Sequence, residues 1–415
     1  MKVYPAYKDS GLNRLGDVPS HWGVYNLKRL TAFNYGDSLS KETRVEGKIP
    51  VFGSNGIVGY HDESITRSPC IIIGRKGSFG KVNYSGTECF PIDTTYFIDE
   101  TATNNNLRWL YYLLLSLRLD AFSKDSAVPG LSREDAYEKR AVLPPLPEQQ
   151  AIANFLDCKT AQIDTLIEKK QRQIDLLQEQ RTALINHAVT KGLNPNAPMM
   201  DSGVEWLGEI PSHWEVKKLK YVGQALIGLT YNPENVTDEE NGTLVLRASN
   251  VYDGKIVFDD NVFVKMEIPE RLITKVGDIL ICVRSGSRDL IGKNALIDEK
   301  SAGHTFGAFM TVFRSDINYF LSYVFKSQLF KVQSGLFNTS TVNQLTQGNL
   351  YSFQIPVPPL GEQEDIIRFL NKELSQVDET INRVAKEIEL LQEYRTALVS
   401  EAVTGKIDVR EWKKT

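Results

Sequence analysis

The stretch that comes closest to a catalytic motif is residues 74–82, which read Gly-Arg-Lys-Gly-Ser-Phe-Gly-Lys-Val. A phosphate-binding loop needs four residues between its outer glycines and a hydroxyl after its lysine to hold magnesium. Here five residues separate Gly74 from Gly80, and Val82 replaces the hydroxyl, which excludes nucleotide binding. We find no zinc-protease, serine-hydrolase or metal-nuclease pattern, and Asn-Pro-Glu at 232–234 is not the Asn-Pro-Pro-aromatic motif of methyl transfer to amino groups. The residues predict no catalytic site.

The four cysteines also indicate no chemistry. Cys70, Cys89, Cys158 and Cys282 are scattered, with no Cys-x-x-Cys pair and no grouped histidine. Zinc sites and disulfide frameworks both need such groupings. We therefore expect no metal site and no cofactor bound by this chain.

Length and composition indicate a globular protein with more than one domain. A chain of 415 residues is too long to fold around one compact core. Its composition, with 41% hydrophobic and 24% charged residues, is typical of soluble proteins. No run of about 18 apolar residues is present, and the N-terminus lacks the apolar core of a signal peptide. We expect a cytoplasmic protein without membrane contact.

The remaining candidate functional residues are basic and polar side chains beside glycines, which are suited to binding DNA. The net charge of −4 does not itself indicate nucleic acid, so these residues must be well placed rather than numerous. Arg can bind the guanine edge and Asn the adenine edge through two hydrogen bonds, while Ser, Thr and Lys mostly contact phosphates. The candidate DNA-binding residues are Asn55, Arg75, Lys76, Ser78, Lys81, Lys124, Ser126, Arg247, Ser249, Asn250, Arg284, Ser285, Ser287, Arg288, Lys293, Asn338, Ser340 and Thr341. A single cluster of this kind is also compatible with a solvated turn. The recurrence of the clusters at matching places in two parts of the chain favours DNA binding.

That recurrence belongs to a tandem duplication. Residues 9–30 return as 201–222, and residues 144–190 return without a gap as 358–404. The middles correspond as well: Cys70 to Gly77 resembles Leu280 to Gly286, which aligns Arg75 with Arg284, and Tyr137 matches Tyr351. Short β-branched strands broken by Gly and Asn, with helical stretches at 107–119 and 319–330, predict two homologous α+β domains.

The elements that must position these domains are two long helices. Their apolar residues follow steps of four and three, which is the spacing of a coiled-coil seam, and the two seams most simply pack on each other. About 45 helical residues span roughly 65 Å, so such a rod is suited to holding two domains apart. A pair of core helices within one domain is the alternative. The predicted seam is Leu156, Ile163, Ile167, Ile174, Leu177, Leu184, Leu370, Leu374, Val377, Ile381, Val384, Ile388, Leu391 and Leu398.

Each half also begins with Pro-Ser-His-Trp, at Pro19 to Trp22 and Pro211 to Trp214. An adjacent Trp favours a docking element at the start of each domain over catalysis by the histidine. The expected boundaries are 1–143 for the first domain, 144–193 for the first helix, 194–357 for the linker and second domain, and 358–415 for the second helix and tail.

Two variable domains, each followed by Pro-Pro-Leu-x-Glu-Gln and a helix with Leu-Leu-Gln-Glu-x-Arg-Thr-Ala-Leu, resemble the DNA specificity subunit of a type I restriction-modification system. The resemblance covers essentially the whole chain, and Leu143 to Gly192 and Val357 to Gly405 are the segments that match most closely. It implies that 1–143 and 194–357 contain target recognition domains, which an antiparallel coiled coil separates with pseudo-two-fold symmetry.

The resemblance also implies a non-catalytic subunit that reads a bipartite, asymmetric double-stranded DNA site. Two methyltransferase subunits and two restriction subunits would dock on it, and S-adenosylmethionine, ATP and magnesium would bind to these partners. A coiled-coil scaffold that joins proteins without touching DNA is the main alternative, and a solitary enzyme with an unrecognised site is another.

Overall fold

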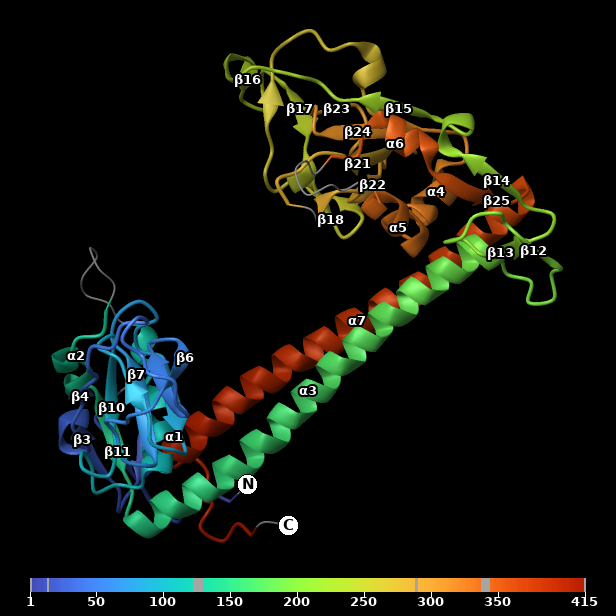
Figure 1. Cartoon of the computed structure of the whole chain (residues 1–415). Coiled ribbons are helices and arrows are strands. Elements are labelled where there is room, and N and C mark those ends of the chain that lie inside the picture. The colour runs from blue at the N-terminus through green and yellow to red at the C-terminus, as the bar shows by residue number, and fades with distance from the viewer. Residues whose placement is uncertain (1, 13–14, 122–129, 288–289, 337–343, 414–415) are drawn as a thin grey trace. The chain divides into compact units, whose positions relative to one another are not determined.

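The computed structural model describes residues 2–12, 15–121, 130–287, 290–336 and 344–413. The chain divides into two compact units, Met1–Gln171 with Ala385–Thr415 (unit 1), and Arg172–Val384 (unit 2). Each unit contains a strand-rich part, here called its head, and a segment of each of two long helices (Figure 1). No helix in the described part of the chain is long and apolar enough to span a membrane.

The head of unit 1 is built on a four-stranded antiparallel sheet of order β4-β10-β7-β8 and a smaller sheet of order β6-β5-β9. Its strands are β1 (Tyr7–Asp9), β2 (Asp17–Pro19), β3 (Gly23–Asn26), β4 (Asn34–Tyr35), β5 (Ile49–Gly53), β6 (Gly56–His61), β7 (Cys70–Gly74), β8 (Val82–Ser85), β9 (Phe90–Pro91), β10 (Thr95–Ile98) and β11 (Arg140–Leu143). Its helices are α1 (Leu107–Leu117) and α2 (Arg133–Glu138), with short 3-10 turns η1 (Leu27–Arg29) and η2 (Leu119–Ala121).

The head of unit 2 repeats this plan with the central sheet order β15-β24-β21-β22. Its strands are β12 (Met199–Asp201), β13 (Glu209–Pro211), β14 (Glu215–Lys218), β15 (Gln224–Ile227), β16 (Val236–Thr237), β17 (Thr243–Leu246), β18 (Val251–Tyr252), β19 (Lys255–Ile256), β20 (Phe263–Val264), β21 (Ile279–Cys282), β22 (Asn294–Leu296), β23 (Thr305–Phe306), β24 (Met310–Arg314) and β25 (Gln354–Val357). Its helices are α4 (Asn318–Val324), α5 (Gln328–Leu336) and α6 (Gln347–Ser352), with η3 (Leu219–Tyr221), η4 (Pro233–Asn235), η5 (Ala248–Asn250) and η6 (Glu270–Leu272).

Hydrogen bonds confirm that the heads share one fold. Both smaller sheets contain one parallel pair, β5 with β9 and β17 with β23. The matched tyrosines play the same part, because the Tyr137 hydroxyl accepts from the Phe33 N–H at 2.7 Å and the Tyr351 hydroxyl from the Ala225 N–H at 3.1 Å. In the described part of unit 1, no strand corresponds to β16 or to the β18–β19 hairpin, which are additions in the longer second domain.

The long helices are α3 (Leu146–Lys191) and α7 (Leu360–Val403), and they lie side by side within each unit (Figure 1). Every predicted seam residue is buried or half-buried, whereas Leu166, Leu176 and Leu390, which fall outside the seam, are exposed. The residues at less than 9% exposure are Leu156, Ile163, Ile174, Leu370, Leu374, Val377, Val384 and Leu398. The spacing of apolar residues therefore identified the buried face.

Ion pairs show that α3 and α7 run antiparallel in unit 1. Arg395 Nε lies 2.8 Å from Asp164 Oδ1, and Lys170 Nζ lies 2.6 Å from Glu387 Oε2. Unit 2 holds the repeat-equivalent of the first pair, in which Arg181 Nε lies 3.2 Å from Asp378 Oδ1. These charged pairs thus connect the two helices within each unit.

One hydrophobic core joins each head to its helical segments. In unit 1 the buried Trp109 and Leu113 of α1 share a cluster with Leu156 of α3 and Leu398 of α7. In unit 2 the buried Phe320 shares a cluster with Ile185 and Leu370. Each head is therefore packed onto both helices within its own unit.

The Pro-Ser-His-Trp turns are docking elements, as the sequence predicts, and the structure shows that each one binds the first turn of a long helix. Glu148 of α3 contacts both rings. Its Oε1 lies 2.7 Å from His21 Nε2, and its Oε2 accepts a hydrogen bond from the Trp22 Nε1–H at 2.9 Å. In unit 2, Glu362 of α7 makes the same contacts. Its Oε1 is hydrogen-bonded to His213 Nε2, and its Oε2 accepts from the Trp214 Nε1–H at 2.9 Å. A carboxylate in the first helical turn also interacts favourably with the helix dipole.

Replacing Glu148 by Ala is expected to destabilise unit 1 by about 1–3 kcal/mol, because Trp22 is fully buried and its N–H would lose its acceptor. Glu362→Ala should have a smaller effect, since the Glu362 side chain is 41% exposed against 12% for Glu148. Water can therefore replace the Glu362 carboxylate as the hydrogen-bond acceptor. Urea denaturation measures both. Glu168→Ala, an exposed change on the same helix, is the control, and a Glu148→Ala curve that matches it would show that this contact contributes no stability.

Candidate nucleic-acid interface

The predicted basic loops lie at the same edge of the two central sheets, after β7 and after β21. The Arg75 and Lys76 N–H groups both donate to the Thr94 carbonyl, and the Val283 and Arg284 N–H groups both donate to the Phe309 carbonyl. Lys76 forms an isolated bridge with Gly130, and Arg284 forms one with Gln344. The structural equivalent of Arg284 is therefore Lys76.

The sequence alignment of Arg75 with Arg284 is wrong by one residue. The two loops differ in length, since residues 75–81 join β7 to β8 and residues 283–293 join β21 to β22. Sequence similarity placed Arg against Arg, whereas the sheet register fixes the true match. At the other end of these loops, Gly80-Lys81 is equivalent to Gly292-Lys293, because the Gly80 N–H donates to the Gly74 carbonyl as the Gly292 N–H does to the Cys282 carbonyl.

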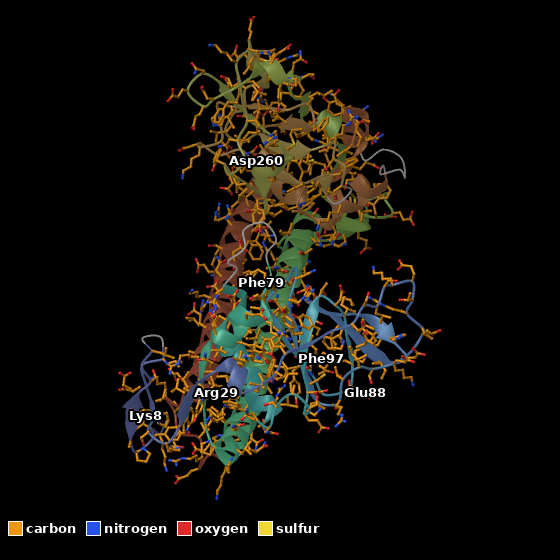
Figure 2. The ribbon with its side chains drawn as sticks, turned by 90° about the vertical axis from the view of Figure 1, so that its left-hand side faces the viewer. Lys8, Arg29, Phe79, Glu88, Phe97 and Asp260 are labelled. Carbon is orange, nitrogen blue, oxygen red and sulfur yellow. The ribbon has the colours of Figure 1, made fainter. Side chains whose placement is uncertain are left out.

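In unit 1, the predicted residues Asn55 and Lys81 contact each other. The Lys81 Nζ donates to Asn55 Oδ1 at 2.7 Å and to the Asn55 carbonyl at 3.0 Å, which joins the β5–β6 turn to the end of the β7–β8 loop. Lys76 and Ser78 are exposed on the adjoining β7–β8 turn, where Figure 2 labels Phe79. This turn needs Gly77, whose φ is +72°. An exposed patch of one amide, one hydroxyl and two ammonium groups can bind phosphates and base edges.

Arg75 is held differently, because its guanidinium is half-buried over the Tyr35 ring, 5.2 Å from the centroid. Arg133 lies 5.0 Å from the same ring. Behind them, the Tyr96 hydroxyl donates to the Leu131 carbonyl at 3.1 Å, and burial raises the pKa of Tyr96 to about 12, which keeps this donor protonated. Sequence reasoning missed Tyr35 and Arg133, which carry no periodic signal and meet only in the fold.

In unit 2, a pocket of about 1000 Å³ gathers four predicted residues, Arg247, Ser249, Arg284 and Ser285. The exposed Arg284 guanidinium lies 5.2 Å from the centroid of the Phe309 ring, which is itself 57% exposed. Such a pair offers a donor fork beside an aromatic face, and both can contact a base. Phe309 was not predicted, because its position directly before a strand is visible in the sequence but its exposure is not.

The other wall of this pocket is less free to bind an anion. Arg247 Nη2 lies 2.8 Å from Asp260 Oδ2, and it also donates to the Asp260 carbonyl at 3.1 Å; Figure 2 labels Asp260. The Asp260 carboxylate offsets the charge of Arg247. Arg284 is therefore the stronger candidate for contacting a nucleic acid.

The prediction that Asn250 binds DNA is wrong. This side chain is fully buried, and its Nδ2 donates to the Val257 carbonyl at 3.1 Å and to Asn261 Oδ1 at 3.2 Å. Its Oδ1 accepts from the Arg247 N–H at 3.0 Å. Asn250 is a structural group that shapes the turn after β17.

The remaining predictions divide by position. Ser287 is exposed beside Ser285, and Lys293 is half-buried with its Nζ 3.4 Å from the Ala248 carbonyl. Outside the described residues lie Lys124, Ser126, Arg288, Asn338, Ser340 and Thr341. Within the described ranges, no three His, Cys, Asp or Glu side chains are grouped closely enough to hold a metal ion.

Comparison with known proteins places this pair of heads in a family. The model of the type I restriction modification DNA specificity domain matches twice, over residues 19–176 and 211–391. The chain belongs to this family, whose members are the non-catalytic specificity components of type I restriction-modification systems. The resemblance found in the sequence is thereby confirmed.

Individual relatives agree. The chain is 30% identical to the EcoKI specificity subunit of Escherichia coli K12 over 50% of this chain and 46% of that one. It is 25% identical to the putative MjaX specificity subunit of Methanocaldococcus jannaschii over 97% of this chain and 98% of that one. A solved structure described for complex assembly and conformational transition of the type I system has a TM-score of 0.72, 15% identity, and covers 94% of this chain and 99% of that one. That likeness concerns the fold alone.

Proposed function

We propose that this chain reads a bipartite, asymmetric site on double-stranded DNA, one half-site with each head. The observation that carries the proposal is that two heads of one fold place different side chains at the same sheet edge, Lys76 in unit 1 and Arg284 beside Phe309 in unit 2. One fold explains a shared mode of docking, and different loops explain different sequences read. The continuous helices α3 and α7 would then act as a coiled-coil spacer between the half-sites.

A titration with DNA over a range of salt concentrations tests this function. Phosphate contacts make log affinity fall linearly with log salt, whereas a scaffold that only joins proteins should bind no duplex. Mapping methylated sites in cells with and without the gene would then identify the target. Loss of a two-part methylated motif on deletion is the expected result, and an unchanged methylation pattern would refute the role.

We also propose that the chain docks two modification (methyltransferase) subunits and two restriction subunits. S-adenosylmethionine, ATP and magnesium would then belong to those partners. Two copies of one partner require the same surface twice. Residues that recur in both repeats and face outward are therefore candidates for docking.

The long helices carry such a surface outside the seam. Its members on α3 are Leu176, Gln178, Glu179, Thr182 and Ala183, and on α7 they are Leu390, Gln392, Glu393, Thr396 and Ala397. Leu176 is 49% exposed and Leu390 is 52% exposed. Packing between α3 and α7 explains why the two repeats have similar residues inside the seam. It does not explain why they have identical residues on this outward stripe. A shallow groove of about 580 Å³ runs along the stripe on α7.

Leu176→Glu is expected to remove one modification subunit from the assembly and Leu390→Glu the other, while the double variant should bind neither. A charge placed at the centre of an apolar contact commonly weakens binding by about 2 kcal/mol or more, roughly 30-fold. Native mass spectrometry of the reconstituted complex counts the copies. Leu166→Glu is the matched control, since Leu166 is 42% exposed on α3 but is replaced by Thr380 in the other repeat. Equal loss with the control variant would remove the stripe from consideration.

A further inference from the structure

A second cavity of unit 2 lies next to the Arg284 pocket and has a different character. Its volume is about 550 Å³, and it is formed where the β18–β19 turn, the end of the β21–β22 loop and the start of α5 meet α3. Four basic side chains line it, namely Arg181, Lys293, Lys326 and Lys331, against one acidic residue, Asp253. Nothing in the base-reading scheme above uses it.

The positive charge in this cavity is only partly compensated. Arg181 pairs with Asp378 at 3.2 Å, so its charge is largely offset within the helix pair. Lys326 is different: among the described residues, its ammonium forms no ion pair and donates no hydrogen bond, and it lies 5.7 Å from the centroid of the Tyr323 ring. Burial, followed by repulsion from Arg181, lowers the pKa of Lys326 below its usual value. A bound anion would offset this cost and favour the charged form of the amine.

The backbone around the cavity is shaped to lie close to Lys326. The β18–β19 turn has Asp253 at φ +45° and Gly254 at φ +71°, which is the left-handed pair that a tight two-residue hairpin requires. A Cβ on Gly254 would lie 3.0 Å from the Lys326 Cε. Glycine therefore lets the main chain approach the side chain of Lys326, which lines the cavity.

Lys293 connects this cavity to the candidate DNA surface. Its side chain lines the cavity, while its Nζ lies 3.4 Å from the carbonyl of Ala248, which lines the Arg284 pocket. A polyanion that enters the Arg284 pocket can therefore continue over Lys293 into the cationic cavity. A DNA strand carries one phosphate for each base pair, about 3.4 Å of axis apart, so a strand that contacts the Arg284 pocket also presents phosphates to the neighbouring surface.

We propose that this cavity is a phosphate subsite, in which Lys326 and Lys331 hold a backbone phosphate of the DNA whose bases contact the Arg284 pocket. The inference rests on the proposed DNA-binding function. The subsite anchors the duplex without reading its sequence, because a phosphate is the same at every base pair.

Unit 1 has no matching subsite in its described residues. The Tyr112 hydroxyl donates to Asp157 in unit 1 as the Tyr323 hydroxyl does to Asn371 in unit 2, which makes these tyrosines equivalent. Lys326 follows Tyr323 by three residues, and the residue at the same distance after Tyr112 is Leu115. Among the described residues, the half-buried lysine of this subsite is therefore present in unit 2 and is replaced by Leu115 in unit 1.

The test compares the wild-type full chain with Lys326→Met, which keeps the aliphatic stem, and with Lys331→Ala, which removes an exposed amine. Fluorescence anisotropy with two duplexes of unrelated sequence gives the affinity at several salt concentrations. Loss of one phosphate contact should weaken binding roughly 3- to 10-fold on both duplexes alike and reduce the salt slope by about one. Lys300→Met, at an exposed lysine that does not line the cavity, should leave the slope unchanged.

The possible outcomes separate cleanly. A wild-type chain that binds no duplex would defeat the proposed function itself. Wild-type binding with unchanged slopes in both variants would overturn the subsite alone, and so would a change of preference between the duplexes. If inorganic phosphate raised the Tm of the wild type but not of Lys326→Met, while DNA slopes stayed unchanged, the cavity would bind free phosphate rather than DNA. Should Lys326→Met fail to fold, the Lys331→Ala slope decides.

Discussion

Insertion of two residues into both long helices, between Gln171 and Arg172 and between Val384 and Ala385, is expected to abolish methylation of the bipartite target in the assembled system. Both points lie where the two units meet along the chain, so the contacts inside each unit are spared. Two residues turn an α-helix by roughly 200°, which carries the seam beyond the insertion to the opposite face. The apolar stripes of the two units could then no longer belong to one continuous helix pair.

Insertion of seven residues at the same points should instead be tolerated. Seven residues complete one seam repeat, so the apolar face continues, and they lengthen each helix by about 10 Å. At about 3.4 Å per base pair, the gap between the half-sites should grow by roughly three base pairs. The half-site sequences should not change, because neither head is altered.

Mapping methylated sites genome-wide for the two variants decides between these results. The two-residue variant serves as the control for the seven-residue one, since it adds less length but breaks the seam. Full activity with an unchanged gap in the seven-residue variant would show that something other than α3 and α7 sets the spacing. Circular dichroism of both variants should confirm that the heads remain folded.

The helices were the part of the fold most open to prediction from sequence. Seam burial depends on a local period, so the positions of Leu156, Val384 and Leu398 are fixed by neighbours three and four residues away. The docking turns were equally accessible, because Pro-Ser-His-Trp and the acceptor glutamates Glu148 and Glu362 recur in both repeats. Duplication within one chain supplied a second copy against which each pattern could be checked.

The candidate site was only partly predictable, because burial in a loop is not periodic. Asn250 and Arg284 read alike in the sequence, as polar residues beside small ones, yet the first is fully buried and the second is exposed. The difference arises from Val257 and Asn261, which approach Asn250 only when the β18–β19 hairpin folds back. The match of Lys76 to Arg284 likewise depended on sheet register rather than on residue type.

That match defines the sharpest test of recognition. Arg284→Ala is expected to relax the half-site read by unit 2 while the preference of the other half-site stays the same. Arg284 is exposed in the pocket beside Phe309, where its guanidinium can form two hydrogen bonds to a guanine. Losing one such contact costs about 1–3 kcal/mol, which is roughly 5- to 150-fold in discrimination at that base pair.

Lys76→Ala, at the equivalent position of unit 1, is the reciprocal variant, and it should alter binding through the other half-site only. Asn250→Ala is the structural control: it should lower stability, because the buried partners of Asn250 lose their hydrogen bonds, without a selective effect on either half-site. Selection from random duplexes, carried out with each assembled variant, reports both half-sites at once. Equal relaxation of both half-sites by Arg284→Ala would contradict the assignment of one head to one half-site, because the Arg284 pocket is built entirely from residues of unit 2.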